Sequence, residues 1–247
     1  MQAKLKKWRE AALRGDIEAQ FRLSQSLYFG VGVRKDVKGA IEWCRKAAQK
    51  GHPTAQFNLG TAYADGSGVP KNPRRAVQWF RRAAKSGIAD AQYNLGNMYD
   101  RGEGVPRDTR VAIRWYRKAA AQNHLSARFN LGVSFAEGDG VPKDPRKAVK
   151  WYRKAAEGHH AKAQYNLALA YASGEGVRTN FKKAAQWFRR ASELEHAKAQ
   201  NWLGNLYFEG KGVKKSIQQC LRWYRRAVQN GDQDARINLK EFPKGER

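Results

Sequence analysis

Apolar and small residues recur along this chain with the spacing of amphipathic helices, in two stripes per segment. From Pro53 to Gly87, the first stripe consists of Ala55, Leu59 and Tyr63, at spacings of four residues. The second stripe follows the start signal Asn72-Pro73 and consists of Ala76, Val77, Phe80, Ala83 and Ala84. Glycines separate the two stripes, so the segment predicts a helix-loop-helix hairpin.

The hairpin pattern repeats with a period of 36 residues. The clearest marker is tryptophan, at Trp43, Trp79, Trp115, Trp151, Trp187 and Trp223. An alanine column from Ala19 to Ala235 and a leucine column from Leu23 to Leu239 keep the same register. A period of this length is typical of stacked repeat units. We therefore expect an all-α fold, a right-handed superhelical solenoid of 36-residue helix-loop-helix repeats.

The repeats predict one continuous array without an internal domain boundary. Residues 1–16 form a half-unit that caps the N-terminal end, and residues 17–232 form six repeats. Residues 233–247 add a partial first helix and a polar tail that caps the other end.

The residues that carry a family resemblance are Ala91-Gln-Tyr-Asn-Leu-Gly-Asn-Met-Tyr, then Gly102-Glu-Gly-Val, then Ala112-Ile-Arg-Trp-Tyr-Arg-Lys-Ala-Ala. This pattern resembles the Sel-one-like repeat (SLR) family, which is related to the tetratricopeptide repeats. Ala168, Asn201-Trp202 and Cys220 depart from it locally. The resemblance implies a bacterial, non-catalytic adaptor that binds protein partners. Some members are scaffolds in envelope assembly, and others are immunity proteins that neutralise secreted toxins, phospholipases included.

The chain is strongly basic, because it has 48 Lys and Arg but only 22 Asp and Glu, which gives a formal net charge of +26. Such an excess favours anionic partners. Cys44 and Cys220 stand almost five periods apart, beyond disulfide reach in a stack. No long apolar run suggests a transmembrane helix or a signal peptide. We expect a bacterial protein, periplasmic if an export signal was removed and otherwise cytoplasmic.

The candidate chemical motifs have structural interpretations that we favour. The Gly-x-Gly-Val loops occur six times between helices, which indicates turns and not a phosphate loop. His52, His124, His160 and His196 share one turn position, too far apart to share a metal. The tryptophans predict core packing in preference to base stacking. We expect no enzyme activity, no cofactor and no metal.

Two surfaces are candidates for function. The outer face of the second helices carries a basic stripe, which we interpret either as a solvated face or as an electrostatic docking surface. Its members are Arg45, Arg74, Arg81, Arg82, Arg110, Arg114, Arg117, Arg146, Lys150, Arg153, Arg189 and Arg190. The inner, concave face of the first helices varies between repeats and predicts partner contacts. These are Arg22, Tyr28, Phe29, Asn58, Asp65, Asn94, Arg101, Asn130, Asn166, Trp202 and Phe208.

The favoured function is a non-catalytic scaffold that binds, and sequesters, an acidic protein partner. A toxin or effector, as for an immunity protein, and an envelope-assembly protein are the specific forms we expect. The alternative is a solenoid that binds nucleic acid or another polyanion through the basic stripe. A third hypothesis is docking on anionic membrane without insertion. We expect a monomer.

Overall fold

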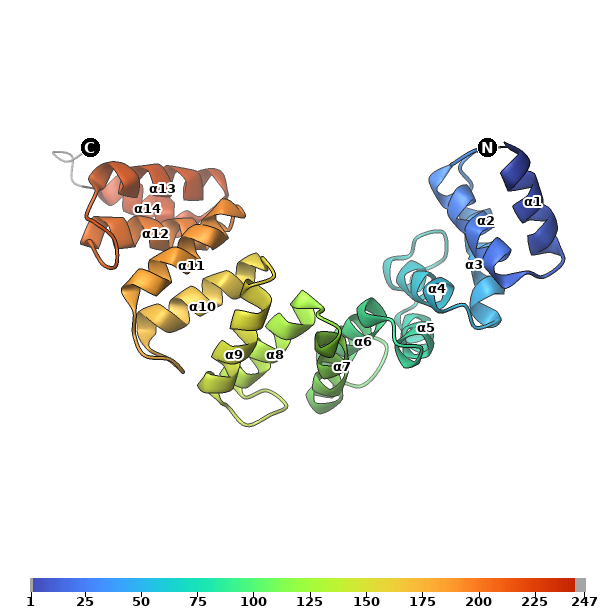
Figure 1. Cartoon of the computed structure of the whole chain (residues 1–247), viewed down its shortest axis with the longest axis horizontal. Coiled ribbons are helices and arrows are strands. Elements are labelled where there is room, and N and C mark those ends of the chain that lie inside the picture. Colours follow the sequence, from blue (N-terminus) through green and yellow to red (C-terminus); the bar gives the residue numbers. More distant parts are fainter. Residues whose placement is uncertain (1, 243–247) are drawn as a thin grey trace. The chain divides into compact units, whose positions relative to one another are not determined.

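The computed structural model describes residues 2–242 (Figure 1). The predicted tail beyond residue 242 lies outside this range. Within it the chain forms fourteen α-helices and no strand. They are α1 Gln2–Leu13, α2 Ile17–Phe29, α3 Val37–Gln49, α4 Pro53–Asp65, α5 Pro73–Lys85, α6 Ala89–Arg101, α7 Thr109–Ala121, α8 Leu125–Glu137, α9 Pro145–Ala156, α10 Ala161–Ser173, α11 Phe181–Glu193, α12 Ala197–Glu209, α13 Ile217–Gln229 and α14 Gln233–Glu241. The predicted all-α repeat fold is confirmed.

The helices pair as antiparallel hairpins, numbered here from the N-terminus. Hairpin 1 is α2 with α3, hairpin 2 is α4 with α5, and so on to hairpin 6, α12 with α13 (Figure 1). The even-numbered helices α2 to α12 are the first helices of their hairpins, and the odd-numbered helices α3 to α13 are the second helices. The described part of the chain divides into two compact units, one that ends at His124 and one that begins at Leu125. Each unit contains three hairpins.

Glycines build the loop inside each hairpin, as the sequence predicts. Gly102 ends α6 in the left-handed conformation with φ of 71°, and its N–H bonds to Met98 O. The next glycine, Gly104, also has positive φ and lies against the backbone of Pro73, where a side chain would not fit. These glycines are therefore explained by the turn and by close packing of the loop on the preceding hairpin.

Three of the turn histidines, His52, His160 and His196, are helix N-caps. The ring Nδ1 of His52, His160 and His196 accepts a hydrogen bond from the backbone N–H three residues on, at 3.1–3.3 Å. Each ring also stacks on an aromatic side chain of the preceding first helix, as Tyr165 does on His196 at 4.6 Å between centroids. Their shared position in the period thus has a local structural cause.

The tryptophans lie differently from the core position that the sequence predicts. Five of the six are half-buried at the edge of the core, and only Trp223, at 9% exposed, is buried. A Lys or Arg three residues on covers each ring, 4.2–5.7 Å from its centroid. The residue after each tryptophan fills the core instead, as Phe80 does at 2% exposed. No helix in the described part of the chain has both the length and the apolar character to span a membrane.

Candidate functional site

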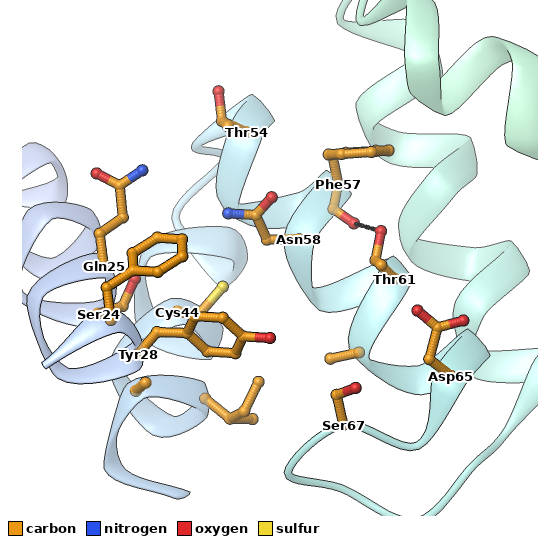
Figure 2. Close-up of a pocket in the computed structure, with 14 residues that line it drawn as sticks. Ser24, Gln25, Tyr28, Cys44, Thr54, Phe57, Asn58, Thr61, Asp65 and Ser67 are labelled. Carbon is orange, nitrogen blue, oxygen red and sulfur yellow. Dashed lines mark hydrogen bonds between the residues drawn. The ribbon is translucent and has the colours of Figure 1, made fainter. Parts of the chain in front are cut away.

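An open groove lies between the first helices of hairpins 1 and 2, with α3 as its floor (Figure 2). Its volume is about 410 Å³. Tyr28 from α2, Ile41 from α3 and Phe57 from α4 supply apolar walls. Polar side chains line it as well, among them Gln25 and Asn58 from the two facing helices. The groove combines apolar walls with a few polar groups, which is the usual make-up of a binding site.

A break in the repeat pattern opens this groove. The residue after the tryptophan is Cys44 in hairpin 1, whereas the other five hairpins carry an aromatic side chain there. These are Phe80, Tyr116, Tyr152, Phe188 and Tyr224. Each ring packs against a small residue of its own first helix, namely Gly60, Gly96, Gly132, Ala168 or Gly204. Hairpin 1 has Ser24 at that position.

A register-matched groove shows the effect of the missing ring. Three repeats further on, Val149, Tyr152, Asn166 and Leu169 stand where Ile41, Cys44, Asn58 and Thr61 stand in the first groove. With Tyr152 in place, that groove has a volume of about 210 Å³ against about 410 Å³ beside Cys44. The groove with the larger volume is therefore the one in which the thiol of Cys44 replaces the aromatic ring.

The thiol in the groove is structural in its chemistry. Cys44 is 4% exposed and its Sγ donates to the carbonyl oxygen of Ala55 at 3.3 Å. Burial raises the pKa of Cys44 to about 12, despite the opposing charge of Arg45. Because the thiolate is the nucleophile, a thiol that stays protonated is unsuited to nucleophilic chemistry. The groove can therefore bind a group but has no activated sulfur.

Four of the predicted first-helix residues come together at this groove: Tyr28, Phe29, Asn58 and Asp65. Tyr28 and Phe29 form an edge-to-face pair at 5.1 Å, with Phe29 68% exposed. Sequence reasoning missed Cys44 and Ser24 as groove residues. The available signal was that the other five hairpins carry an aromatic residue at the position of Cys44 and glycine or alanine at the position of Ser24.

The remaining first-helix candidates lie elsewhere. Arg22 is paired with Glu18 at 2.7 Å, and Arg101 is exposed near Glu103 at 3.7 Å. Trp202 stacks on Phe188 at 5.7 Å and Phe208 lies against Phe242 at 5.5 Å, so both rings are partly covered. The half-buried asparagines are Asn94, Asn130 and Asn166, the last of which lines the smaller groove. These residues do not gather at one site.

Much of the basic stripe takes part in packing. Arg81, Arg153 and Arg189 donate to tyrosine hydroxyls of the next first helix, Tyr99, Tyr171 and Tyr207, at 2.6–3.0 Å. Arg82 and Arg190 cover tryptophan rings, Trp79 and Trp187, each at 4.6 Å. All members of the stripe are exposed except Arg45, which is half-buried, so the packing members also keep part of their surface in solvent.

One part of the stripe does form a pocket. Arg45, which is half-buried, joins Arg75 and Arg82 around Tyr63 and Trp79, where a volume of about 400 Å³ is open to solvent. Three repeats on, Arg153, Lys183 and Arg190 repeat the arrangement around Trp187, with a volume of about 310 Å³. In the part of the chain that the structure describes, no three His, Cys, Asp or Glu side chains gather as a metal site would require.

The comparisons with known proteins agree with the repeat geometry. The family model described as Sel1 repeat matches residues 17–52, 53–88, 89–124, 125–160, 161–196 and 197–232. Among curated proteins, no sequence matches. Proteins built from Sel1 repeats generally mediate protein–protein interaction and are generally non-catalytic scaffolds.

Two solved structures are similar in both sequence and fold. One is c5321, a protective antigen of uropathogenic Escherichia coli with an SLR fold, at a TM-score of 0.91 and 34% identity. The match covers 95% of this chain and 50% of that one, so this chain spans half the length of that relative. The other is a Sel1 repeat protein from Oxalobacter formigenes, with a TM-score of 0.79, 33% identity, and 87% and 84% of the two chains covered. Six matched repeats and these relatives show that the chain belongs to the Sel1 repeat family.

Proposed function

We propose that this chain is a scaffold that holds a protein partner against its first helices, with the groove between α2 and α4 as the main contact. The observation that carries the proposal is the exposed pair Tyr28 and Phe29 at the edge of that groove. Aromatic side chains dominate the energy of protein interfaces when they border a pocket. The general role of Sel1 repeats supports the same class of function.

The net charge supports a partner that is acidic overall. A formal charge of +26 accelerates and orients the encounter with an anionic protein. Arg74, Arg110 and Arg146 are exposed and contribute to this field. A partner covered along the first helices would be sequestered, as a toxin is by an immunity protein, and this is the specific form of the proposal.

A second candidate function is binding of a polyanion such as nucleic acid. The pocket around Arg45, Arg75 and Arg82 favours it, because three guanidinium groups and two aromatic rings converge there. The covered tryptophans weigh against base stacking along the whole stripe, since a cation already occupies one face of each ring.

Affinity capture from the source bacterium, with and without nuclease, separates the two functions. The scaffold proposal expects one dominant protein that survives nuclease and is lost with Tyr28→Ser/Phe29→Ser. The matched control is Arg45→Gln/Arg75→Gln, which should keep that protein. Recovery of nucleic acid alone, abolished by the arginine variant, would refute the scaffold proposal and support the second candidate.

A further inference from the structure

Five of the six hairpins contain an aromatic ring that the first hairpin lacks. In hairpin 2, Phe80 lies 5.9 Å from Phe57 between ring centroids, and a Cβ on Gly60 would approach the Phe80 ring to 2.7 Å. Tyr116 has the same arrangement, 6.0 Å from Tyr93 and with Gly96 beneath it. The repeat thus has a defined place for a planar six-membered ring between its two helices.

Where the ring is a tyrosine, the repeat also binds its hydroxyl. Tyr116 donates to Asn97 Oδ1 at 2.7 Å, and Tyr224 donates to Asn205 Oδ1 at 2.5 Å. Tyr152 instead hydrogen-bonds Asn166 of the next first helix. Amide side chains at two positions of the period therefore serve the hydroxyl.

The groove beside hairpin 1 has both amides, Gln25 from α2 and Asn58 from α4, but hairpin 1 has no ring at the position of Cys44. Gln25 is at the position of Asn97 and Asn205, and Asn58 is at the position of Asn166. Both side chains line the groove, and Figure 2 shows them on the two sides of the space above the Cys44 sulfur. Tyr28, Ile41 and Phe57 provide the apolar contacts that a ring requires.

The space is sufficient for such a ring. An apolar cavity of roughly 150 Å³ is enough to bind benzene in another protein. The groove beside Cys44 has about 410 Å³, and the register-matched groove beside Tyr152 has about 210 Å³. The difference leaves room for a ring and for the chain that carries it.

We infer that the groove between α2 and α4 is a binding site for a tyrosine side chain of the protein partner, which takes the place of the ring missing at Cys44. The inference rests on the proposed scaffold function and names the chemistry that its main contact recognises. The ring packs on Ile41 and Phe57, and its hydroxyl donates to the side-chain oxygen of Gln25 or Asn58. The exposed Tyr28 and Phe29 cover the entry once the side chain is bound.

The first test uses p-cresol, which is a tyrosine side chain without its backbone, and toluene, which lacks the hydroxyl. Binding to the full chain is followed by protein-observed NMR titration. We expect saturable binding of one p-cresol per chain, several-fold weaker binding of toluene, and shifts confined to residues around the groove. Ser24→Gly/Cys44→Phe, which rebuilds the pattern of hairpin 2, should reduce p-cresol binding at least tenfold.

Three variants make this test specific. Cys44→Ala keeps the space and should bind p-cresol as the native chain does, and Cys220→Ala controls for loss of the other thiol. Gln25→Leu/Asn58→Leu should remove the preference for p-cresol over toluene. Absence of saturable p-cresol binding to the native chain, or binding that persists after the groove is filled, would overturn the inference.

A peptide selection separates this inference from the proposed function. Peptides displayed on phage and selected on the native chain should share a tyrosine and lose binding to Ser24→Gly/Cys44→Phe. Peptides that bind both proteins equally would overturn the tyrosine site and leave the scaffold function intact. Binding of p-cresol without any peptide or protein partner would support the ring site and refute the scaffold function. Concentration-dependent self-association that filling the groove abolishes would identify a second copy as the occupant and overturn the partner assignment.

Discussion

Filling the groove beside Cys44 should stabilise the protein. The change is Ser24→Gly/Cys44→Phe, which gives hairpin 1 the same pair that Gly60 and Phe80 form in hairpin 2. Phe80 is 2% exposed at the matched position, so the introduced ring should be almost fully removed from water. The variant therefore adds buried apolar surface without disturbing the repeat geometry.

The magnitude follows from three contributions. Full burial of a phenylalanine side chain contributes about 1.5–3 kcal/mol. The replaced thiol is already buried and reduces this gain, and glycine in place of serine within α2 costs about 0.5 kcal/mol of helix propensity. We expect a net stabilisation of about 0.5–1.5 kcal/mol. For a chain of this size that corresponds to a rise in Tm of about 1–6 °C.

The single variant Cys44→Phe makes the experiment decisive. Cys44→Phe alone leaves the Ser24 side chain against the ring, where the built Cβ at Gly60 lies 2.7 Å from Phe80 Cδ1. Overpacking of this kind costs about 1–3 kcal/mol and should cancel the gain. Urea denaturation followed by circular dichroism measures all variants under one condition. A double variant no more stable than the native chain would show that the groove is not the space of a missing ring.

Three further outcomes follow from the contacts described. Gly96→Ala should destabilise the fold by about 1–3 kcal/mol, because the alanine Cβ would lie 2.6 Å from the buried Tyr116 ring, and this cost exceeds the gain from alanine's higher helix propensity. Urea denaturation measures the change, and an unchanged midpoint would contradict this packing. Burial, together with the charges of Lys162 and Lys198, lowers the pKa of His196. The neutral ring, which caps α12, therefore stabilises the protein above the unfolded pKa of about 6.5, and this stabilisation is lost as the pH falls below that value. Denaturation midpoints at pH 7.5 and 5 should differ less in His196→Asp than in the native chain, and an equal difference would argue against the cap. Burial raises the pKa of Cys44 to about 12 and of Cys220 to about 11, so a thiol reagent at pH 8 should modify both only after denaturant is added, and rapid labelling of the native chain would refute their burial.

The fold was open to prediction because each repeat is specified by local rules. Spacings of four residues give the helix faces, Asn72-Pro73 gives a helix start, and Gly102 gives a helix end. A hairpin needs only its neighbours to bury its apolar faces, so the same local pattern is sufficient at every position. The period then carries the prediction along residues 17–232 without any knowledge of distant contacts.

The contacts of the basic and tryptophan side chains were less open to prediction. A periodic apolar residue favours a core position, but Trp79 is only half-buried, since the residue after it occupies the core. The guanidinium of Arg81 reaches Tyr99 in the next hairpin, 18 residues away. Periodicity gives the face on which such a side chain lies but not the partner that it reaches. The stripe that sequence alone presents as free charge is therefore in part a set of packing contacts.

The groove shows where the period itself becomes informative about function. A residue that follows the period is sufficiently explained by packing, because it does the same work in every hairpin. Cys44 stands where the other five hairpins have a buried aromatic ring, and Ser24 stands where they have glycine or alanine. Hairpin 1 therefore lacks a ring that the other five hairpins bury. Stability is easily gained by filling such a space, so a native sequence that leaves it open gives up stability that a repeat readily supplies. The amides that bind the ring's hydroxyl elsewhere are nevertheless present as Gln25 and Asn58. A groove that keeps the acceptors and lacks the ring is organised to receive that ring from another molecule.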